Sequence, residues 1–232
     1  MRIAICIPAH GDTRAAFTLS LSRMLLRTVK DWSRAFPGQA LALEIFMGTG
    51  GIVAFVRERL VETAEKWGAD WILWLDSDQS FPADSLIRLA AAGEPVIGAN
   101  IPRRSPDATP TAEILDEHGQ RRLLWTTPEK IAQRAVEPVH LMGLGVCLMS
   151  MAALKAIPRP VFDELREDQC LMRKLREAGF VPKVDHALSA EVGHVGTFTW
   201  TNAHSLEGRA RMQGQAQIPL SPGLSVSGKL EP

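Results

Sequence analysis

Two aspartates separated by one residue follow the apolar stretch Trp71-Ile72-Leu73-Trp74-Leu75. Asp76 and Asp78 flank Ser77, and carboxylates this close repel each other unless a cation lies between them. Hard oxygen ligands suit Mg²⁺ or Mn²⁺. A strand that leaves the core into a loop, with both aspartates capping turns, gives the same pattern. Asp76 and Asp78 are therefore candidate metal ligands.

A second pair of acidic residues, Glu167 and Asp168, lies in a segment with helical periodicity at 163–178. The apolar positions of this segment include Leu171, and a step of three residues back from Leu171 places Asp168 on the same inward face. Acidic residues at a helix start also favour the positive end of the helix dipole, which is an alternative structural reason for this pair. The functional interpretation is that Asp168 lines a cleft and acts as a base.

His194 stands between Gly193 and Val195, and Gly196 follows. Small residues around a histidine allow its ring to approach a ligand, and neutral imidazole is a competent third ligand for Mn²⁺ beside two carboxylates. A histidine with a structural role in a turn is the alternative.

The elements that must position these residues alternate over the first hundred positions. Short apolar strands are predicted at 3–8, 41–47, 71–75 and 95–99, and helices at 15–32, 53–67 and 86–92. This rhythm predicts a mostly parallel, doubly wound sheet. Asp76 and Asp78 then lie at the carboxyl end of a buried strand, where open α/β sheets keep their ligand crevices.

The second half of the chain has a different character. Residues 102–138 are rich in Pro and charge and predict a loop with edge strands, and the apolar stretch 139–150 is interrupted by Gly143 and Gly145, which predicts a bent strand. A short helix is expected at 152–156, a helix at 163–178 and short strands at 180–184 and 190–192. Beyond about residue 202 the composition predicts a mobile or loosely packed tail over 202–232.

Composition limits the functional classes. The 232 residues are 46% hydrophobic and 22% charged, which is typical of one globular domain. Lys plus Arg and Asp plus Glu are 26 each, so no overall basic field attracts nucleic acid or an anionic membrane. The widely spaced Cys6, Cys147 and Cys170 suit reduced thiols, and no apolar stretch approaches the roughly 18 residues of a membrane helix. We therefore expect a soluble, cytoplasmic protein without a membrane segment.

Taken together, these segments resemble the GT-A glycosyltransferases, in particular the small bacterial and phage-type enzymes similar to family 2. The resemblance spans roughly residues 71–198, and three segments carry it: residues 76–82 with 97–104, residues 143–149, and residues 167–180 with 193–196. They follow one another in the family's order. The resemblance implies an α/β GT-A fold, Rossmann-like, with a mostly parallel central sheet flanked by helices. It also implies one domain over 1–201, with a nucleotide-sugar-binding half at 1–100 and an acceptor-side half at 101–201.

The resemblance further implies a site. Asp76, Asp78 and His194 would hold a Mn²⁺ or Mg²⁺ ion that bridges the nucleotide diphosphate, and Asp168, with Glu167 as its neighbour, would be the base of an inverting reaction. The nucleotide sugar would contact Pro8, Ala9, His10, Arg57, Asp76, Ser77, Asp78, Arg103, Gly143 and Gly145, where Arg57, or Arg103 and Arg104, assist the departing phosphate and the two glycines leave space for a sugar. The implied activity is a metal-dependent, hexosyltransferase-like transfer of one sugar from a nucleotide-diphosphate sugar to an acceptor hydroxyl.

Some features leave alternatives open. The loop after the second strand has no acidic residue, so the donor base is not defined, and the Q-x-x-R-W signature of processive enzymes is absent, which favours transfer of a single sugar. The glycines at 48 and 50 lack the third glycine of a dinucleotide-binding turn. A metal-dependent nucleotidyltransferase and a non-catalytic nucleotide-sugar-binding relative remain alternatives. The acceptor is equally open among a glycan, a lipid-linked sugar, a small molecule, a protein and a modified nucleic-acid base.

Overall fold

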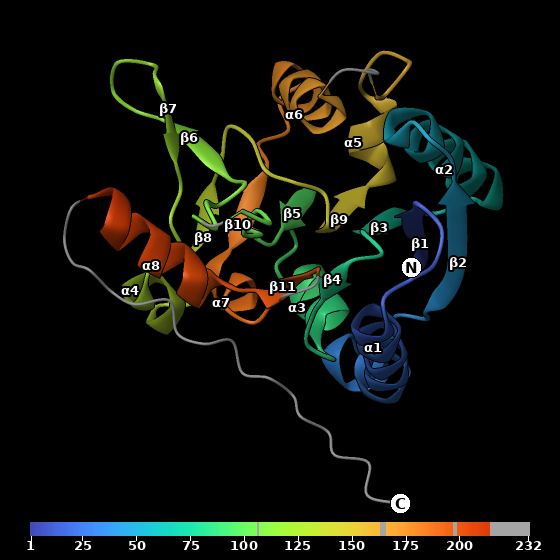
Figure 1. Ribbon diagram of the computed structural model, residues 1–232. Coiled ribbons are helices and arrows are strands. Elements are labelled where there is room, and N and C mark those ends of the chain that lie inside the picture. The colour runs from blue at the N-terminus through green and yellow to red at the C-terminus, as the bar shows by residue number, and fades with distance from the viewer. Residues whose placement is uncertain (106, 163–165, 197–198, 214–232) are drawn as a thin grey trace, which may run out of the picture.

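A central sheet with the strand order β2-β1-β3-β9-β5-β10-β8 runs through the computed structural model (Figure 1), which describes residues 1–105, 107–162, 166–196 and 199–213. Its strands are β1 (Arg2–Ala9), β2 (Ala42–Thr49), β3 (Trp71–Leu75), β5 (Val96–Gly98), β8 (Val136–Pro138), β9 (Val146–Ser150) and β10 (Lys183–Asp185). β1, β2, β3, β5 and β10 run in one direction, and β8 and β9 run in the other. The predicted mostly parallel α/β sheet is therefore confirmed.

Helices cover both faces of this sheet because its strands alternate two sets of apolar side chains. Helices α2 (Val53–Trp67), α5 (Met151–Lys155) and α6 (Glu167–Glu177) pack on one face, over a core that includes Cys6, Trp74 and Met149. Helices α1 (Ala15–Ala35), α3 (Ser85–Ala91) and α7 (His186–Ser189) pack on the other, over a core that includes Ile5 and Leu73. The inner strands β1, β3, β5 and β9 thus bury both of their faces, as their continuous apolar sequences require, whereas the edge strands β2 and β8 are partly exposed.

The order of strands in the sheet differs from their order in the chain. β9 comes from the second half of the sequence and lies antiparallel between β3 and β5 of the first half. It is also shorter than the predicted bent strand at 139–150, because only residues from Val146 onward enter the sheet. β3 consequently has a partner on each side, and its carboxyl end has a fixed position.

A second, small sheet of order β12-β11-β4 builds on that end. It contains β4 (Gln79–Ser80), β11 (Gly193–Val195) and β12 (Thr199–Trp200). β11 pairs with β4 in the register His194 opposite Gln79, and Val195 N donates to Asp78 O at 2.7 Å. The strand expected at 190–192 lies instead at Gly193–Val195, and this shift places His194 directly beside the aspartates.

Residues 100–135 form an excursion with its own hairpin, β6 (Glu113–Leu115) and β7 (Arg121–Leu123), followed by α4 (Pro128–Ala132). The predicted edge strands in this region are confirmed by the hairpin. Helix α8 (Asn202–Met212) corrects the boundary of the expected loose tail, since Asn202 and Ser205 are buried. Positions 214–232 lie outside the described residues.

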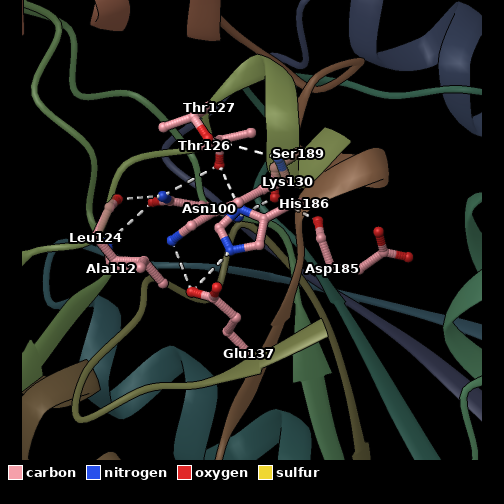
Figure 2. Close-up of polar contacts among 10 residues, drawn as sticks. All are labelled: Asn100, Ala112, Leu124, Thr126, Thr127, Lys130, Glu137, Asp185, His186 and Ser189. Carbon is pink, nitrogen blue, oxygen red and sulfur yellow. Dashed lines mark hydrogen bonds and ion pairs between the residues drawn. The ribbon is translucent and has the colours of Figure 1, made fainter. Parts of the chain in front are cut away.

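A buried polar network joins the start and the end of this excursion (Figure 2). The Asn100 side chain donates to Leu124 O at 2.7 Å and accepts from Ala112 N at 3.0 Å, and its backbone N–H donates to Ser189 Oγ at 2.8 Å. A fully buried amide with all of these partners fixes one backbone arrangement. The segment that carries Pro102, Arg103 and Arg104 is therefore anchored at both ends.

The same network continues to His186, which is fully buried. Its Nδ1 lies 2.9 Å from Thr126 Oγ1, and its Nε2 lies 3.3 Å from Glu137 Oε2, which also accepts from Lys130 Nζ at 2.8 Å. The order Thr126, His186, Glu137 is similar to that of a hydroxyl nucleophile, its histidine base and the carboxylate that orients the histidine. Thr126 is only 2% exposed, so no substrate reaches it, and we assign the network a structural role.

Candidate functional site

The loop that follows β3 carries the two aspartates. Asp76 N donates to Gly145 O at 3.0 Å, and Gln79 N donates back to Asp76 O at 3.1 Å, which closes a turn around Ser77 and Asp78. The turn lies beyond the carboxyl end of β3, as the sequence predicts. Both carboxylates are half-buried there.

Arg57 of α2 binds the first of these carboxylates. Its Nη2 donates to Asp76 Oδ1 at 2.8 Å, and its guanidinium carbon lies 5.6 Å from the centre of the Trp74 ring. Arg57 is only 4% exposed. Among its described surroundings, Nε and Nη1 of Arg57 have no hydrogen-bond partner. A buried guanidinium with two free donors can serve a further oxyanion.

Burial raises the pKa of Asp76, and the negative charges of Asp78 and Glu167 raise it further, while Arg57 and His194 oppose this shift. This pattern has two consequences. The first is that the charge of Arg57 offsets only part of the effect of burial, so the pKa of Asp76 stays above its ordinary value. In addition, Glu167 of α6 lies close enough to act electrostatically on the β3 loop, so residues 91 positions apart in sequence converge here.

Asp78 and His194 face each other. His194 Nε2 lies 3.2 Å from Asp78 Oδ2, while Nδ1 of the same ring lies 3.0 Å from Pro102 O. A carbonyl oxygen accepts only, so Nδ1 carries a proton, and Nε2 then faces a carboxylate either as imidazolium or with a cation between them. Burial would raise the pKa of Asp78, but the hydrogen bond and charge of His194 and the charge of Arg104 hold that pKa below its ordinary value.

These groups fit a divalent cation in part. Two ligand atoms bound at right angles to Mg²⁺ are roughly 3.0 Å apart, close to the observed separation of Nε2 and Oδ2. Asp76, the third predicted ligand, is bound to Arg57. Within the described ranges, no three His, Cys, Asp or Glu side chains are grouped as in a metal centre. The structure thus brings the predicted pair Asp78 and His194 together and gives Asp76 a different primary partner.

Two consecutive arginines after β5 have different partners. Arg104 Nη1 lies 3.2 Å from Asp78 Oδ2, whereas Arg103 Nη2 points to Glu113 Oε1 at 3.9 Å. Of the two arginines, Arg104 is therefore the one that contacts Asp78, while Arg103, the predicted nucleotide-sugar contact, is directed to Glu113. Both arginines are predicted from the sequence as groups that could assist the departing phosphate. The sequence alone does not define which way each of two adjacent loop side chains points.

A cavity of about 400 Å³ opens beside Asp78. It is lined by His10, Asp12, Thr13, Arg14, Ser77, Asp78 and Arg104. His10, Ser77 and Asp78 were predicted, whereas Pro8 and Ala9 are buried in β1 and do not line it. Asp12, Thr13 and Arg14 were not predicted, although their position directly after the loop at the carboxyl end of the first strand is a usable signal. Arg14 and Arg104 give this cavity two cationic side chains.

Helix α6 carries the predicted base. Leu171, Met172 and Leu175 are fully buried on its inner face, as predicted, and the helix begins at Glu167, with 163–165 outside the described residues. Burial and the neighbouring charge of Glu167 raise the pKa of Asp168, and Arg57 and the Gln169 N–H, which donates to Asp168 Oδ1 at 2.8 Å, lower it. A carboxylate with a raised pKa is a stronger base than an exposed one.

The two glycines before β9 have a role other than the expected one. A Cβ built on Gly143 would lie 3.3 Å from Thr111 Oγ1, and one on Gly145 would lie 2.7 Å from Ile101 Cδ1 and 3.1 Å from Gln79 Cδ. The space beside both glycines is thus filled by the protein's own side chains, which corrects the expectation that it holds a sugar. The glycines instead let the excursion pack against the end of β3.

Solved structures with the same architecture are found, although the sequence itself matches no family model and no curated protein. The crystal structure of A197 from STIV superposes with a TM-score of 0.57 at 16% identity, covering 88% of this chain and 92% of that one. The crystal structure of GalNAc-T7 with UDP, GalNAc and Mn²⁺ superposes with a TM-score of 0.55 at 9% identity. The fold is that of the GT-A glycosyltransferases. The GT-A resemblance seen in the sequence is thereby confirmed at the level of fold, while the likeness to family 2 is not.

The extent of these matches differs. The superposition on GalNAc-T7 covers 94% of this chain but only 51% of that chain, so this chain spans about half the length of GalNAc-T7.

Over its described residues, the chain has no helix of the length and apolarity needed to cross a membrane.

Proposed function

We propose that this protein is a glycosyltransferase that moves one sugar from a nucleotide-diphosphate sugar to an acceptor hydroxyl. The observation that carries this proposal is the pair Asp78 and His194, 3.2 Å apart at the carboxyl end of β3 and beside a cavity with Arg14 and Arg104. The GT-A fold supports the proposal, as does the presence of UDP and Mn²⁺ in the GalNAc-T7 structure. The donor diphosphate would lie in the cavity next to Asp78.

A divalent cation, Mn²⁺ or Mg²⁺, held by Asp78 and His194 would supply positive charge to the departing diphosphate. The chain itself adds charge at the same place. Arg104 lies within 3.2 Å of Asp78, and Arg57 offers two donors without partners among the described residues. Guanidinium groups aimed at the leaving group stabilise the charge that develops in the transition state.

Asp168 is the proposed base of an inverting reaction. It lies on α6, close enough to the aspartate loop that the charge of Arg57 lowers the pKa of both Asp76 and Asp168. A sugar hydroxyl is a weak acid, so Asp168 would accept its proton as the new bond forms rather than beforehand. Glu167 raises the basicity of Asp168 through its charge.

The ion pair between Asp76 and Arg57 favours a second candidate function. It satisfies one carboxylate without a metal, which is what a non-catalytic nucleotide-sugar-binding protein would require. The two candidates differ in turnover: the transferase hydrolyses or transfers its donor, and the binding protein does not.

The deciding experiment is a thermal-shift panel of nucleotide sugars with and without Mn²⁺, followed by a donor-hydrolysis assay on each donor that binds. A ligand at one hundred times its dissociation constant stabilises the folded state by about 2.7 kcal/mol, which is readily detected. Selective, Mn²⁺-dependent stabilisation with turnover supports the transferase. Stabilisation without turnover would favour the binding protein, and no shift with any donor would exclude both.

A further inference from the structure

A second polar cavity, of about 410 Å³, lies on the acceptor side of the molecule. One wall is α6, whose residues Gln169, Arg173 and Arg176 lie at intervals of four and three and so share one helical face. Arg166, which directly precedes the helix in a left-handed conformation, lines the same wall. The other wall includes His140 and Arg121 of β7. The hairpin and α6 both lie in the upper part of the view in Figure 1.

The charges around this cavity are unbalanced. Arg173 is paired with Glu177 at 3.0 Å, and Arg121 Nη1 lies 3.7 Å from Glu113 Oε2. In the described part of the chain, Arg166 is ion-paired with no carboxylate.

Arg176 is the fourth guanidinium of the cavity, and among the described residues it has no ion-pair partner. It donates to the backbone oxygen of His140 and to Nε2 of the same residue at 3.2 Å. His140 therefore accepts at Nε2 and is neutral, and burial together with Arg176 and Arg121 lowers its pKa. Burial and Arg121 lower the pKa of Arg176 as well. Among the described residues, the carboxylates paired with these four arginines are Glu113 and Glu177, which leaves an excess of two positive charges in a partly enclosed site.

We propose that this cavity binds the phosphate group of the acceptor. The inference rests on the proposed transferase function, and it names the chemical class of the acceptor that function leaves open. Guanidinium groups bind phosphate oxygens in bidentate geometry, and an excess of two positive charges matches a phosphate dianion. A neutral sugar alone would leave the charges of Arg166 and Arg176 without an ion-pair partner among the described residues.

The position of the cavity agrees with this role. Arg166 and Gln169 flank Glu167 and Asp168 in sequence on the first turn of α6, and the Gln169 N–H is bonded to the Asp168 carboxylate at 2.8 Å. Glu167 and Asp168 do not line the cavity themselves, so an acceptor held by its phosphate at the arginines would extend past the first turn of α6 to bring its hydroxyl to Asp168. Fixing one end of a substrate restricts the motion of its hydroxyl relative to the base.

The test is a calorimetric titration of the full chain with inorganic phosphate at constant ionic strength. The variant Arg166→Gln/Arg173→Gln removes two charges seven residues apart on α6. Its matched control, Arg23→Gln/Lys30→Gln, removes two exposed charges with the same spacing on α1, over the other face of the sheet. We expect phosphate affinity to fall at least tenfold in the α6 variant and to be unchanged in the control, with both variants keeping the melting temperature of the parent.

Phosphate also has a possible site beside Asp78, so the titration is repeated in Arg104→Gln. A phosphate site that survives Arg104→Gln and is lost in Arg166→Gln/Arg173→Gln supports the proposal. Equal phosphate affinity in the α6 variant and its control, or the absence of saturable binding in the parent, overturns it. Glycerol phosphate and dimethyl phosphate then distinguish a monoester from a polymer diester, and binding of either at the α6 arginines supports the site.

Donor hydrolysis with Mn²⁺ is measured in parallel on the parent chain. Hydrolysis without phosphate binding means that the transferase function stands and the acceptor inference fails. Phosphate binding at the α6 arginines without hydrolysis or donor binding means that the anion site exists but the proposed function fails. The two proposals therefore fail by different results.

Discussion

At the scale of single residues, the site is a set of carboxylates whose charges are controlled by a few cations. Arg57 holds Asp76, and His194 with Arg104 holds Asp78. Neighbouring positive charges and hydrogen bonds offset the effect of burial less at Asp168 than at Asp78. The pKa of Asp168 is accordingly raised, while that of Asp78 is lowered. Carboxylates whose pKa values are pushed apart are suited to different roles, the first to accept a proton and the second to remain ionised.

Asp78→Asn removes one charge from the proposed metal pair while preserving its shape. We expect loss of Mn²⁺-dependent donor stabilisation and a fall in donor turnover of at least about 100-fold, because the leaving diphosphate loses its main source of positive charge. The control is Asp84→Asn, at a half-exposed carboxylate nearby. Mn²⁺-dependent turnover equal to that of the parent would contradict the assignment of Asp78.

The pH dependence of transfer reports on Asp168. A base must be ionised to act, so the rate decreases as pH falls through its pKa. Because burial and Glu167 raise that pKa, the acidic limb of kcat/KM should lie above that of an ordinary aspartate. Glu167→Gln, which removes a neighbouring negative charge, should move the limb to lower pH. A limb that does not move in this variant would exclude Asp168 as the titrating group.

Arg57→Met leaves Asp76 without its cation and removes a buried charge. Loss of one partner of a buried ion pair typically costs about 3–5 kcal/mol, and the partial exposure of Asp76 places this case at about 3 kcal/mol or less. Adding Asp76→Asn to this variant should recover part of the loss, which a urea-unfolding cycle of the four proteins measures. Additive losses would show that the two residues do not interact.

At the scale of elements, the site depends on pieces of chain that are distant in sequence. β11 sets His194 against β4, while the Asn100 and His186 network anchors the excursion that carries Pro102 and Arg104. His186 is fully buried, and burial and the charge of Lys130 lower its pKa. The polar network around His186 therefore favours the neutral form of its imidazole.

This network makes stability sensitive to acid. The unfolded chain takes up a proton at His186 near pH 6.5, whereas the folded protein resists it, so the free energy of unfolding decreases as pH falls below about 6.5. For one such histidine, the free energy of unfolding changes by up to about 1.4 kcal/mol per pH unit. Urea unfolding at pH 7.5 and 5.5 should show a smaller pH effect in His186→Gln than in the parent. An identical pH effect in both proteins would refute this role of His186.

The sequence predicts those elements whose signal is local. Helix α2 and strand β3 have the predicted bounds because an uninterrupted helical stripe and a five-residue apolar stretch define them. Elements defined by distant partners were misjudged: β11 follows its pairing with β4, and α8 has a polar, glycine-containing sequence whose buried Asn202 bonds to Ser189 O. Tertiary contacts also decide which way a loop side chain points and which spaces stay open. For this reason Arg104, rather than Arg103, lies beside Asp78, and protein side chains fill the space beside Gly143 and Gly145.

At the scale of the whole molecule, two apolar cores on opposite faces of one sheet hold the chain together. Cys6 and Cys147 lie in the core beneath α2, fully buried, and burial raises the pKa of the Cys6 thiol to about 12. The Cys147 pKa is raised as well. Thiols in such surroundings are inert until the fold opens.

Thiol labelling consequently measures global opening. Under native conditions we expect Cys6 and Cys147 to react with a thiol reagent only at the rate of global unfolding, and thus to accelerate together with added urea. Cys170, which borders the basic cavity, is the internal comparison and should react faster. Mass spectrometry of labelled peptides separates the three sites. Labelling of Cys6 at a rate independent of urea would reveal local opening instead.

The insertion of β9 between β3 and β5 has a consequence for biosynthesis. While a ribosome has made only the first hundred residues, β3 and β5 are both present but the strand that joins them is not. The open edges of β3 and β5 are apolar and unpaired at that stage, which is the condition under which nascent chains associate or recruit chaperones. The sheet closes, and the Asp76 turn gains its bond to Gly145, only after residues 145–150 have emerged.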